Sequence, residues 1–306
     1  MDKLKCIKRM KDINIIFIMV FHYLKYVVRI VRVLMKGQSE TYEIMQLAHR
    51  LEKGLVHQSP KPMWGWEKAE RLCLLLTKNK ESISYETGLA VINKYLEAKM
   101  LVADECKLAI GLKSKYNLGL TDTDGGAIYL PKPIISDVDI ATFEKIVSSR
   151  HSVRNFDNKH LDIARINKAI KLALNCPSAC NRQPFKVYVL SDDLRKSIGV
   201  VDESSASLYV TGIIDAFCVT EMLDWIVSPS IFVGYLTLSL HLYGIGSCIY
   251  RKDLVCDTEY NRKVKKVCDI PDTEQIILEL RIGDYPSVIN AAVSNRFSIS
   301  QITKYL

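Results

Sequence analysis

The chain has 306 residues, of which 48% are hydrophobic and 25% are charged, so it can bury the core of one large or two smaller globular domains. Its nine cysteines show no metal-ligand spacing, and the closest pair, Cys176 and Cys180, has no matching His/Cys cluster, so we expect no metal site. The odd cysteine count, without a secretory leader, favours reduced thiols in a cytoplasmic protein.

The net charge of +8 is concentrated at the N-terminus, where residues 1–38 hold nine Lys or Arg against two Asp. A nucleic-acid-binding protein more often carries basic surface through its folded body, so we expect no nucleic-acid partner. Lys25, Arg29, Arg32 and Lys36 are spaced by four, three and four residues, which predicts one basic helix face. Ile, Val, Leu and Phe occupy the opposite face.

Three roles stay open for this basic amphipathic helix, residues 1–38. It can pack its apolar face on the rest of the protein, or residues 1–36 can lie on an anionic membrane surface. A true membrane anchor is the third alternative, although the uninterrupted apolar part is shorter than the roughly 20 residues that a spanning helix needs. We therefore expect a cytoplasmic protein, with peripheral membrane contact as an alternative.

Helical periodicity continues over residues 39–116, for example in "ETYEIMQLAHRLEKGL", where Gly54 suggests a break near the helix end. Residues 117–140 collect Gly, Asp, Thr and Pro, which predicts a linker. The segment from 141 to 306 then alternates between helix and strand patterns. We expect a helical extension, a linker and a C-terminal domain.

Within that domain the pattern predicts an amphipathic helix over residues 162–176 and strands over 185–190 and 274–283. The stretch beginning at Pro229 is apolar nearly all round, which is typical of a buried central helix. The domain is therefore of the α+β or α/β class. The chain has no GxxxxGK[ST], GxSxG or HExxH stretch, which disfavours P-loop enzymes and common hydrolases.

The stretch "SSRHSVRNF" sets two arginines, an imidazole and a hydroxyl within five positions. Arg150, His151, Ser152 and Arg154 form a dense set of donors for an anion, although a solvated loop is equally compatible with the pattern. Further on, "NCPSACNRQPF" is stiffened by prolines and offers amide side chains that both donate and accept hydrogen bonds. Such a loop suits the edge of a heterocycle, and its alternative is a polar turn. The stretch "YGIGSC" is too short for a dinucleotide motif and favours a helix C-cap.

The order of "RHSVRNF", a helix, "PSACNRQPF" before a strand, and later "YGIGSC", "RIGDYP" and "VSNRF" resembles the nitroreductase family of flavin enzymes, over about residues 142–306. The resemblance implies an α+β fold, nitroreductase-like, with an antiparallel-type central sheet flanked by helices. It also implies a homodimer with FMN at the interface. The preceding helices resemble the N-terminal extension of a subgroup associated with polysaccharide or cell-surface gene clusters.

In that family the arginine-rich motif holds the phosphate and ribityl chain of FMN. The positions that the resemblance assigns to this part are Arg150, His151, Ser152, Arg154, Ser294 and Arg296. His151 stands where the family usually has a second Arg, so a pH-sensitive cation replaces a permanent one. We expect slightly weaker phosphate binding, not its loss.

The other motifs match segments that surround the flavin ring in the family. The positions assigned to the ring are Pro177, Ser178, Ala179, Asn181, Gln183, Ile249, Tyr250 and Arg251. Asn181 would bond the pyrimidine side, residues 177–179 would line the ring from the other subunit, and residues 249–251 would pass near flavin N5. Phe185 replaces the usual Trp, and Pro229, before the expected central helix, stands where Gly is frequent.

The resemblance implies an FMN-dependent oxidoreductase in which flavin N5 accepts a hydride from NAD(P)H and passes electrons to a small-molecule acceptor. No side chain is assigned as catalytic. The alternative is a catalytically degenerate nitroreductase-fold scaffold or partner module at the membrane surface, in a cell-surface polysaccharide pathway. In the extension, His49, Glu52 and Lys53 of "HRLEKGL" either cover the site or form ordinary surface ion pairs.

Overall fold

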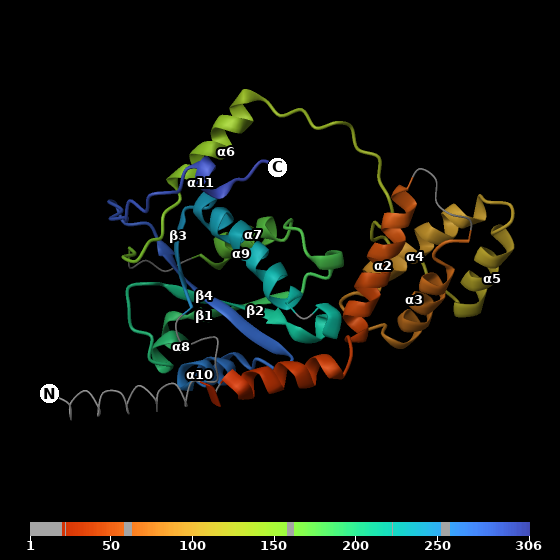
Figure 1. The fold of residues 1–306 in the computed structure, drawn as a ribbon, viewed down its shortest axis with the longest axis horizontal. Coiled ribbons are helices and arrows are strands. Elements are labelled where there is room, and N and C mark those ends of the chain that lie inside the picture. Colours follow the sequence, from red (N-terminus) through yellow and green to blue (C-terminus); the bar gives the residue numbers. More distant parts are fainter. Residues whose placement is uncertain (1–19, 22, 58–62, 158–161, 222, 252–257) are drawn as a thin grey trace.

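The computed structural model describes residues 20–21, 23–57, 63–157, 162–221, 223–251 and 258–306 (Figure 1). A helical unit and a larger unit around a β-sheet lie side by side. The helices of the first unit are α2 (Glu40–Val56), α3 (Trp66–Lys78), α4 (Tyr85–Met100) and α5 (Cys106–Tyr116).

The helical unit has its own hydrophobic core, to which α2, α3 and α4 contribute most of the buried side chains. In α2 the buried residues Ile44, Leu47 and Leu51 recur at helical spacing, as the sequence predicts. Gly54 does not break this helix, which continues to Val56. It lies under the Trp64 ring, and a Cβ at this position would come within 1.9 Å of that ring. Glycine at this position therefore allows the Trp64 ring to pack directly on the backbone of α2.

The second unit contains a four-stranded sheet in the order β1-β2-β4-β3, in which every neighbouring pair is antiparallel. Its strands are β1 (Phe185–Ser191), β2 (Ala206–Ile213), β3 (Ile245–Tyr250) and β4 (Glu274–Asp284). The predicted α+β class with an antiparallel sheet is confirmed, and so are the strands predicted over 185–190 and 274–283. The sequence patterns did not predict β2 or β3.

Helices cover both faces of the sheet. One face packs against α7 (Ile163–Ala173) and α9 (Asp224–Leu242) and forms the larger hydrophobic core. The other face packs against α8 (Asp192–Ser197) and α10 (Glu259–Cys268) around a smaller apolar cluster. This second face also holds buried polar groups, among them Arg195 and Glu279.

The central helix α9 differs from its prediction in two ways. It begins at Asp224, so Pro229 lies inside the helix and not before it. Proline lacks the N–H that would bond the Trp225 carbonyl one turn back. That carbonyl approaches β2 so closely that a Cβ on Gly212 would come within 1.9 Å of it. The helix is also only about half buried, since Val227 and Tyr235 are exposed.

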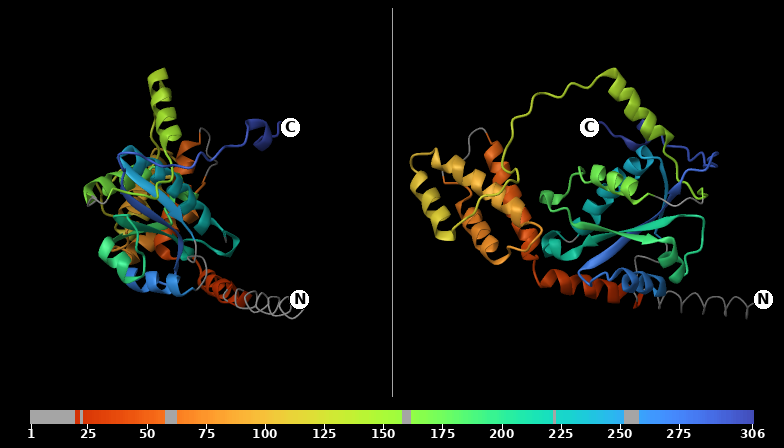
Figure 2. Two further views of the ribbon diagram at one scale, coloured as in Figure 1. Left: turned by 90° about the vertical axis from the view of Figure 1, so that its left-hand side faces the viewer. Right: turned by 180° about the vertical axis from the view of Figure 1, so that it is seen from behind.

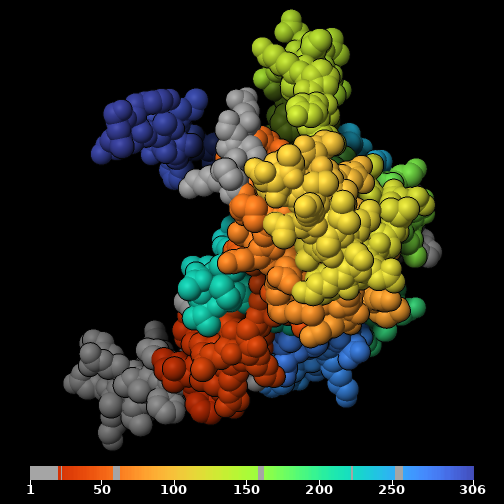
Figure 3. Space-filling view, turned by 90° about the vertical axis from the view of Figure 1, so that its right-hand side faces the viewer, coloured from red at the N-terminus to blue at the C-terminus, as the bar shows by residue number. Residues whose placement is uncertain are grey.

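Two segments project from the sheet unit (Figures 2 and 3). Residues 117–136 form no helix or strand, and α6 (Asp137–Ser149) follows with a capping box between Ser136 and Asp139. No residue of α6 is buried. The C-terminal segment after β4 is mostly exposed as well and contains only the short helix α11 (Ile299–Ile302).

The N-terminal helix runs along the edge of the sheet unit (Figure 1). The structure describes its residues 20–21 and 23–35. Its residues Ile30, Val33 and Leu34 are buried in the larger core. Arg29 donates to the backbone oxygens of Asp272 (2.7 Å) and Glu274 (3.2 Å). Arg29 is half-buried and its guanidinium fixes the helix to the start of β4 and the residues before it. It also lines one groove with Lys25, Arg32 and Lys36, in agreement with the predicted basic face.

Candidate functional site

The arginine-rich motif forms a short extended segment along β3. Ser152 pairs with Ser247 in a parallel bridge, and the Val153 N–H donates to the Ser247 oxygen at 3.0 Å. Val153 is buried against Gly246, whereas Arg154 is exposed. The alternation of an extended chain thus turns one side chain into the core and presents its neighbours on the surface.

The cations of this motif have no internal counterion among the residues that the structure describes. Arg150 is half-buried at the end of α6, and His151 and Arg154 are exposed. No carboxylate in the described ranges forms an ion pair with any of the three. Guanidinium groups in such a setting can bind an external anion through charge-assisted hydrogen bonds.

A histidine that the sequence analysis did not assign to the site lies beside this motif. The His241 ring lies between Ser149 Oγ, 2.8 Å from Nε2, and the Tyr285 hydroxyl, 2.7 Å from Nδ1. Burial lowers the pKa of His241, and the positive charges of Arg150 and His151 lower it further. These residues come from three distant segments, so no local spacing in the sequence could have signalled the cluster.

Arg165 fixes the turn between α9 and β3, and with it the start of the strand that the motif pairs with. Its guanidinium donates to the Tyr243 oxygen at 2.9 Å and to the Gly244 oxygen at 2.9 Å. A third hydrogen bond, of 2.9 Å, reaches a carboxylate oxygen of Asp284 at the end of β4. The cation thereby bonds the two carbonyls that directly follow α9, which is the favourable place for positive charge at a helix end.

The second motif forms a tight loop between α7 and β1, with the 3-10 turn η1 (Ala179–Asn181) at its centre. Ser178 Oγ accepts from the Gln183 N–H at 3.0 Å, and the Ala179 N–H donates to Ser228 Oγ of α9 at 3.3 Å. Cys180, Asn181 and Gln183 all have φ near +50°. Such values are uncommon outside glycine and cluster at functional sites. Pro177 and Asn181 are exposed, and Ser178 and Ala179 are partly exposed.

A buried arginine inside this loop anchors it to the core. The Arg182 guanidinium makes two hydrogen bonds to the Glu221 carboxylate, of 3.0 and 2.8 Å, and donates to the Ala216 oxygen at 3.2 Å. It also lies 4.8 Å from the centroid of the Phe217 ring. Burial alone would raise the pKa of Glu221, but the hydrogen bonds and charge of Arg182 lower it. The sequence analysis missed Arg182, whose only signal was a lone charge in an otherwise uncharged loop.

The remaining assigned residues lie at the far end of β3 and in the C-terminal segment. Ile249 points to the α9 face of the sheet and is 48% exposed. The Tyr250 ring points to the other face, where the Arg281 guanidinium lies 4.0 Å from its centroid. Arg251 is exposed just after the strand. Ser294 and Arg296 lie in the projecting C-terminal segment, where the Arg296 side chain donates to the Ser294 oxygen.

The two main motifs do not come together within one chain. Ser228, which holds the second loop, lies near the start of α9, whereas His241, beside Arg150, lies near its end. At 1.5 Å per residue, about 20 Å of helix separates these two positions. A ligand that contacts both motifs therefore needs one of them from a second copy of the chain.

The helical extension approaches the second loop directly, because α2 packs against η1. The amide of Gln46, oriented to accept from both guanidinium groups, lies between Arg182 and Arg50, 3.1 Å from the latter. His49 and Glu52 of "HRLEKGL" form a partly exposed ion pair at 3.5 Å. Lys53 lies in the last turn of α2 and is exposed.

Comparison with known proteins gives one family match and a set of similar folds. Residues 147–207, which include both motifs, α7, β1 and the start of β2, match the family model for the nitroreductase family. This match agrees with the family resemblance that the two motifs carry. No curated protein matches the chain.

Solved structures similar to this chain include a nitroreductase family protein from Streptococcus pneumoniae, with 19% identity and a TM-score of 0.44. The match covers 54% of this chain and 100% of that protein's chain. A nitroreductase-like protein from Streptococcus mutans is 20% identical with a TM-score of 0.45, over 55% and 99% of the two chains. An FMN-dependent nitroreductase from Clostridium difficile is 17% identical with a TM-score of 0.42, over 49% and 92%.

Proposed function

We propose that this protein binds FMN and works as an FMN-dependent oxidoreductase of the nitroreductase type. The observation that carries the proposal is the set of cations at residues 150–154, which the β3 bridge holds at the surface without an internal counterion among the described residues. When bound, FMN supplies the redox chemistry, taking a hydride from NAD(P)H and passing electrons to a small-molecule acceptor.

The donor chemistry of the motif fits the phosphate and ribityl chain of FMN. Arg150 and Arg154 supply planar guanidinium groups that match phosphate oxygens, and Ser152 supplies a hydroxyl. His151 adds a charge only when it is protonated. Arg296 is a further cation, in the projecting C-terminal segment (Figure 2).

The loop around Asn181 fits the ring end of the flavin. Asn181 is exposed, the backbone of the loop is held in an uncommon conformation, and Arg182 anchors the loop to the core. A preorganised loop of this kind orients a planar ligand without a large ordering cost. Since this loop and the cationic motif lie about 20 Å apart along α9, we propose that they act across a homodimer, each chain completing the site of the other.

Exposed apolar surface supports this dimer. α6 has no buried residue although Ile140, Phe143 and Val147 are all apolar, and Phe143 is 61% exposed. The outer side of α9 exposes Ile231 and Tyr235, and the C-terminal segment exposes further apolar side chains, namely Val288, Val293, Phe297, Ile299 and Ile302. Extensive exposed apolar surface is typical of an interface between subunits.

The first test is the absorption spectrum of the purified protein, with FMN identified after heat release. We expect flavin bands and about one FMN per chain in a dimer. The Arg154→Ala variant should lose most of the FMN and keep the melting temperature of the flavin-free protein, whereas Lys107→Ala, which removes an exposed cation on α5, should keep its FMN. A protein that stays colourless and does not bind added FMN would refute the proposal and favour the scaffold alternative.

The dimer has its own test, which does not depend on turnover. Light scattering should give twice the mass of the chain, and a Phe143→Asp variant should shift the population towards the monomer. FMN should bind the monomeric variant more weakly, because the monomer offers only one of the two motifs at each site. A monomer that binds FMN as tightly as the wild-type protein would contradict a shared site.

A further inference from the structure

The N-terminal helix has a second apolar face in addition to the one that it packs on the sheet unit. Its outer strip consists of Phe21, Leu24, Val28, Val31 and Met35, spaced by three, four, three and four residues. Each of these side chains is at least 41% exposed, and Met35 is 76% exposed. Residue spacing and exposure together give a continuous apolar strip along the outer side of the helix.

Basic side chains border this strip. Lys25 lies against Phe21, with Nζ 4.4 Å from the ring centroid. Lys25, Arg32 and Lys36 line the same groove as the apolar side chains, a groove of about 850 Å³. The sequence from residue 13 to residue 38 contains no Asp or Glu, and residues 1–12 add five more basic residues. The surface therefore combines exposed apolar groups with positive charge.

A cationic cavity adjoins the strip where the helix meets α10. This cavity, of about 300 Å³, is lined by Lys25, Arg29, Arg262 and Lys265 together with one carboxylate, that of Asp272. Lys25, Arg29 and Asp272 line both the cavity and the groove. Lys25 lies where the cavity and the groove meet, so the cavity places further positive charge beside the apolar strip.

We propose that this outer strip docks on an anionic phospholipid surface, with its apolar side chains among the lipids and the flanking cations at the head groups. A helix lying in a membrane interface has this composition, with apolar residues on one side and Lys or Arg beside them. A protein partner would have to be strongly acidic around an apolar groove. The lipid surface offers both features at once, so the charge pattern favours it.

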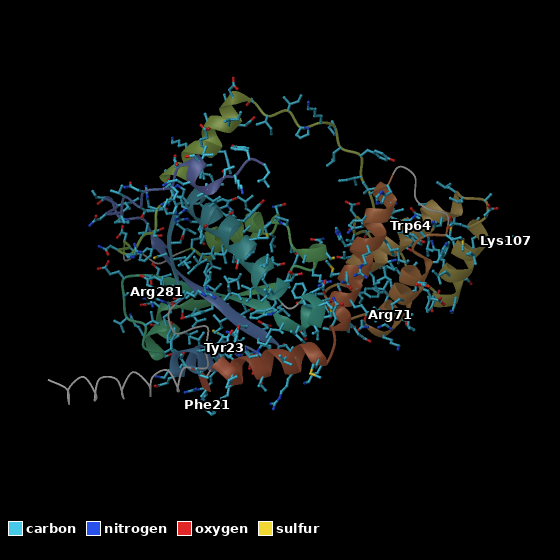
Figure 4. All side chains as sticks on the ribbon, in the orientation of Figure 1. Phe21, Tyr23, Trp64, Arg71, Lys107 and Arg281 are labelled. Atoms are coloured by element: carbon cyan, nitrogen blue, oxygen red, sulfur yellow. The ribbon has the colours of Figure 1, made fainter. Side chains whose placement is uncertain are left out.

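The placement of the helix is compatible with an open flavin site. In Figures 1 and 2 the N-terminal helix lies along one end of the sheet unit, whereas α6 and the arginine-rich motif that follows it lie at the opposite end. Figure 4 places Phe21 at the outer edge of the molecule. A protein bound through the outer strip therefore keeps the motif at residues 150–154 turned away from the lipid.

The test uses the full chain and sedimenting vesicles of phosphatidylcholine alone or mixed with phosphatidylglycerol. We expect the protein to sediment with the mixed vesicles, to stay in solution with phosphatidylcholine alone, and to be released by raised salt, which screens exposed charges. A full chain that stays in solution with the mixed vesicles overturns the proposal, whatever its flavin content.

Matched variants locate the contact. Leu24→Ser with Val28→Ser should weaken binding to the mixed vesicles by about tenfold or more, since two apolar contacts are lost. Leu108→Ser with Ile110→Ser removes two side chains of similar exposure on α5 and should leave binding unchanged. Both double variants replace exposed residues, so neither should change the melting temperature of the protein. Equal losses for both pairs overturn the assignment to the outer strip.

Charge reversal tests the cations in the same way. Lys25→Glu with Arg32→Glu should weaken vesicle binding by more than about tenfold. The control, Lys80→Glu with Lys107→Glu, changes the net charge equally in the helical unit and should have little effect. If the outer-strip variants keep vesicle binding but alter the mass of the particle in light scattering, the strip is a contact between two copies of the chain, and the lipid proposal fails.

Discussion

Arg182 should be the side chain on which the second loop depends most. It is 1% exposed, and its guanidinium bonds both oxygens of the Glu221 carboxylate and the Ala216 carbonyl. Removing one partner of a buried ion pair costs about 3–5 kcal/mol, because the other charge is left unpaired. Since Glu221 is 25% exposed and can gain water, we expect Arg182→Met to cost about 3 kcal/mol, at the lower end of that range.

The magnitude converts into a measurable melting shift. For a chain of this size each kcal/mol moves the melting temperature by about 2–4 °C, so Arg182→Met should lower it by about 6–12 °C in a thermal unfolding experiment. The double variant Arg182→Met with Glu221→Gln should recover part of the loss, because it removes the unpaired charge. The loop should also lose its fixed conformation, so FMN binding should weaken at temperatures where the protein is folded.

The chain offers a matched control for this experiment. Arg71 makes the same two-bond contact to the Glu43 carboxylate, at 2.8 and 2.8 Å, but 43% of its side chain is exposed (Figure 4). Exposed pairs contribute about 0.2–1 kcal/mol, so Arg71→Met should lower the melting temperature by no more than about 4 °C. If the two variants shift it equally, burial does not determine the strength of the Arg182 contact and the reasoning is refuted.

Other changes give distinct results. Burial lowers the pKa of His241 in the folded protein, so the unfolded chain takes up the proton first, and stability should fall as the pH drops below about 6.5, the ordinary histidine pKa. Between about pH 7.5 and pH 5.5 the melting temperature should fall less for His241→Gln than for the wild-type protein, and an equal fall would contradict this view. Gly212→Ala should cost about 3 kcal/mol by urea unfolding, because a Cβ would come within 1.9 Å of the Trp225 carbonyl, which moves only with α9. Gly54→Ala should cost less, about 1–2 kcal/mol, since Trp64 is a side chain that can shift and alanine favours the helix; a larger cost than at Gly212 would argue against this ranking.

The parts of the fold that the sequence predicted are those with a local signature. The amphipathic helix before the second motif and the strands at 185–190 and 274–283 have regular periodicity, and the structure contains them. β2 is buried at every position, so its sequence shows no alternation, and β3 was hidden in a glycine-rich stretch that also suits a helix cap. A short apolar run does not by itself distinguish these possibilities.

The candidate site shows the same difference between local and long-range features. The arginine-rich motif and the proline-stiffened loop are each contiguous along the chain, so their residue types could be recognised from the amino-acid sequence alone. Arg182, His241 and Tyr285 owe their roles to contacts between segments 39 to 92 residues apart, and only the fold brings those segments together. Nothing in the sequence indicated that the two motifs lie at opposite ends of α9, since that separation depends on where the helix begins and ends.

The extension, the N-terminal helix and the second loop converge on one short stretch of backbone after β2. Gln38, just after the N-terminal helix, donates to the Ala216 oxygen at 3.0 Å, and Arg182 of the loop donates to that same oxygen at 3.2 Å. The Ser39 N–H donates to the Asp215 oxygen at 2.8 Å immediately before α2 begins. A shift of the N-terminal helix at a lipid surface would therefore act on the carbonyl that Arg182 uses to hold the loop. Since α2 also packs on η1, the extension and the segment just before it contact both the second loop and the backbone that anchors it.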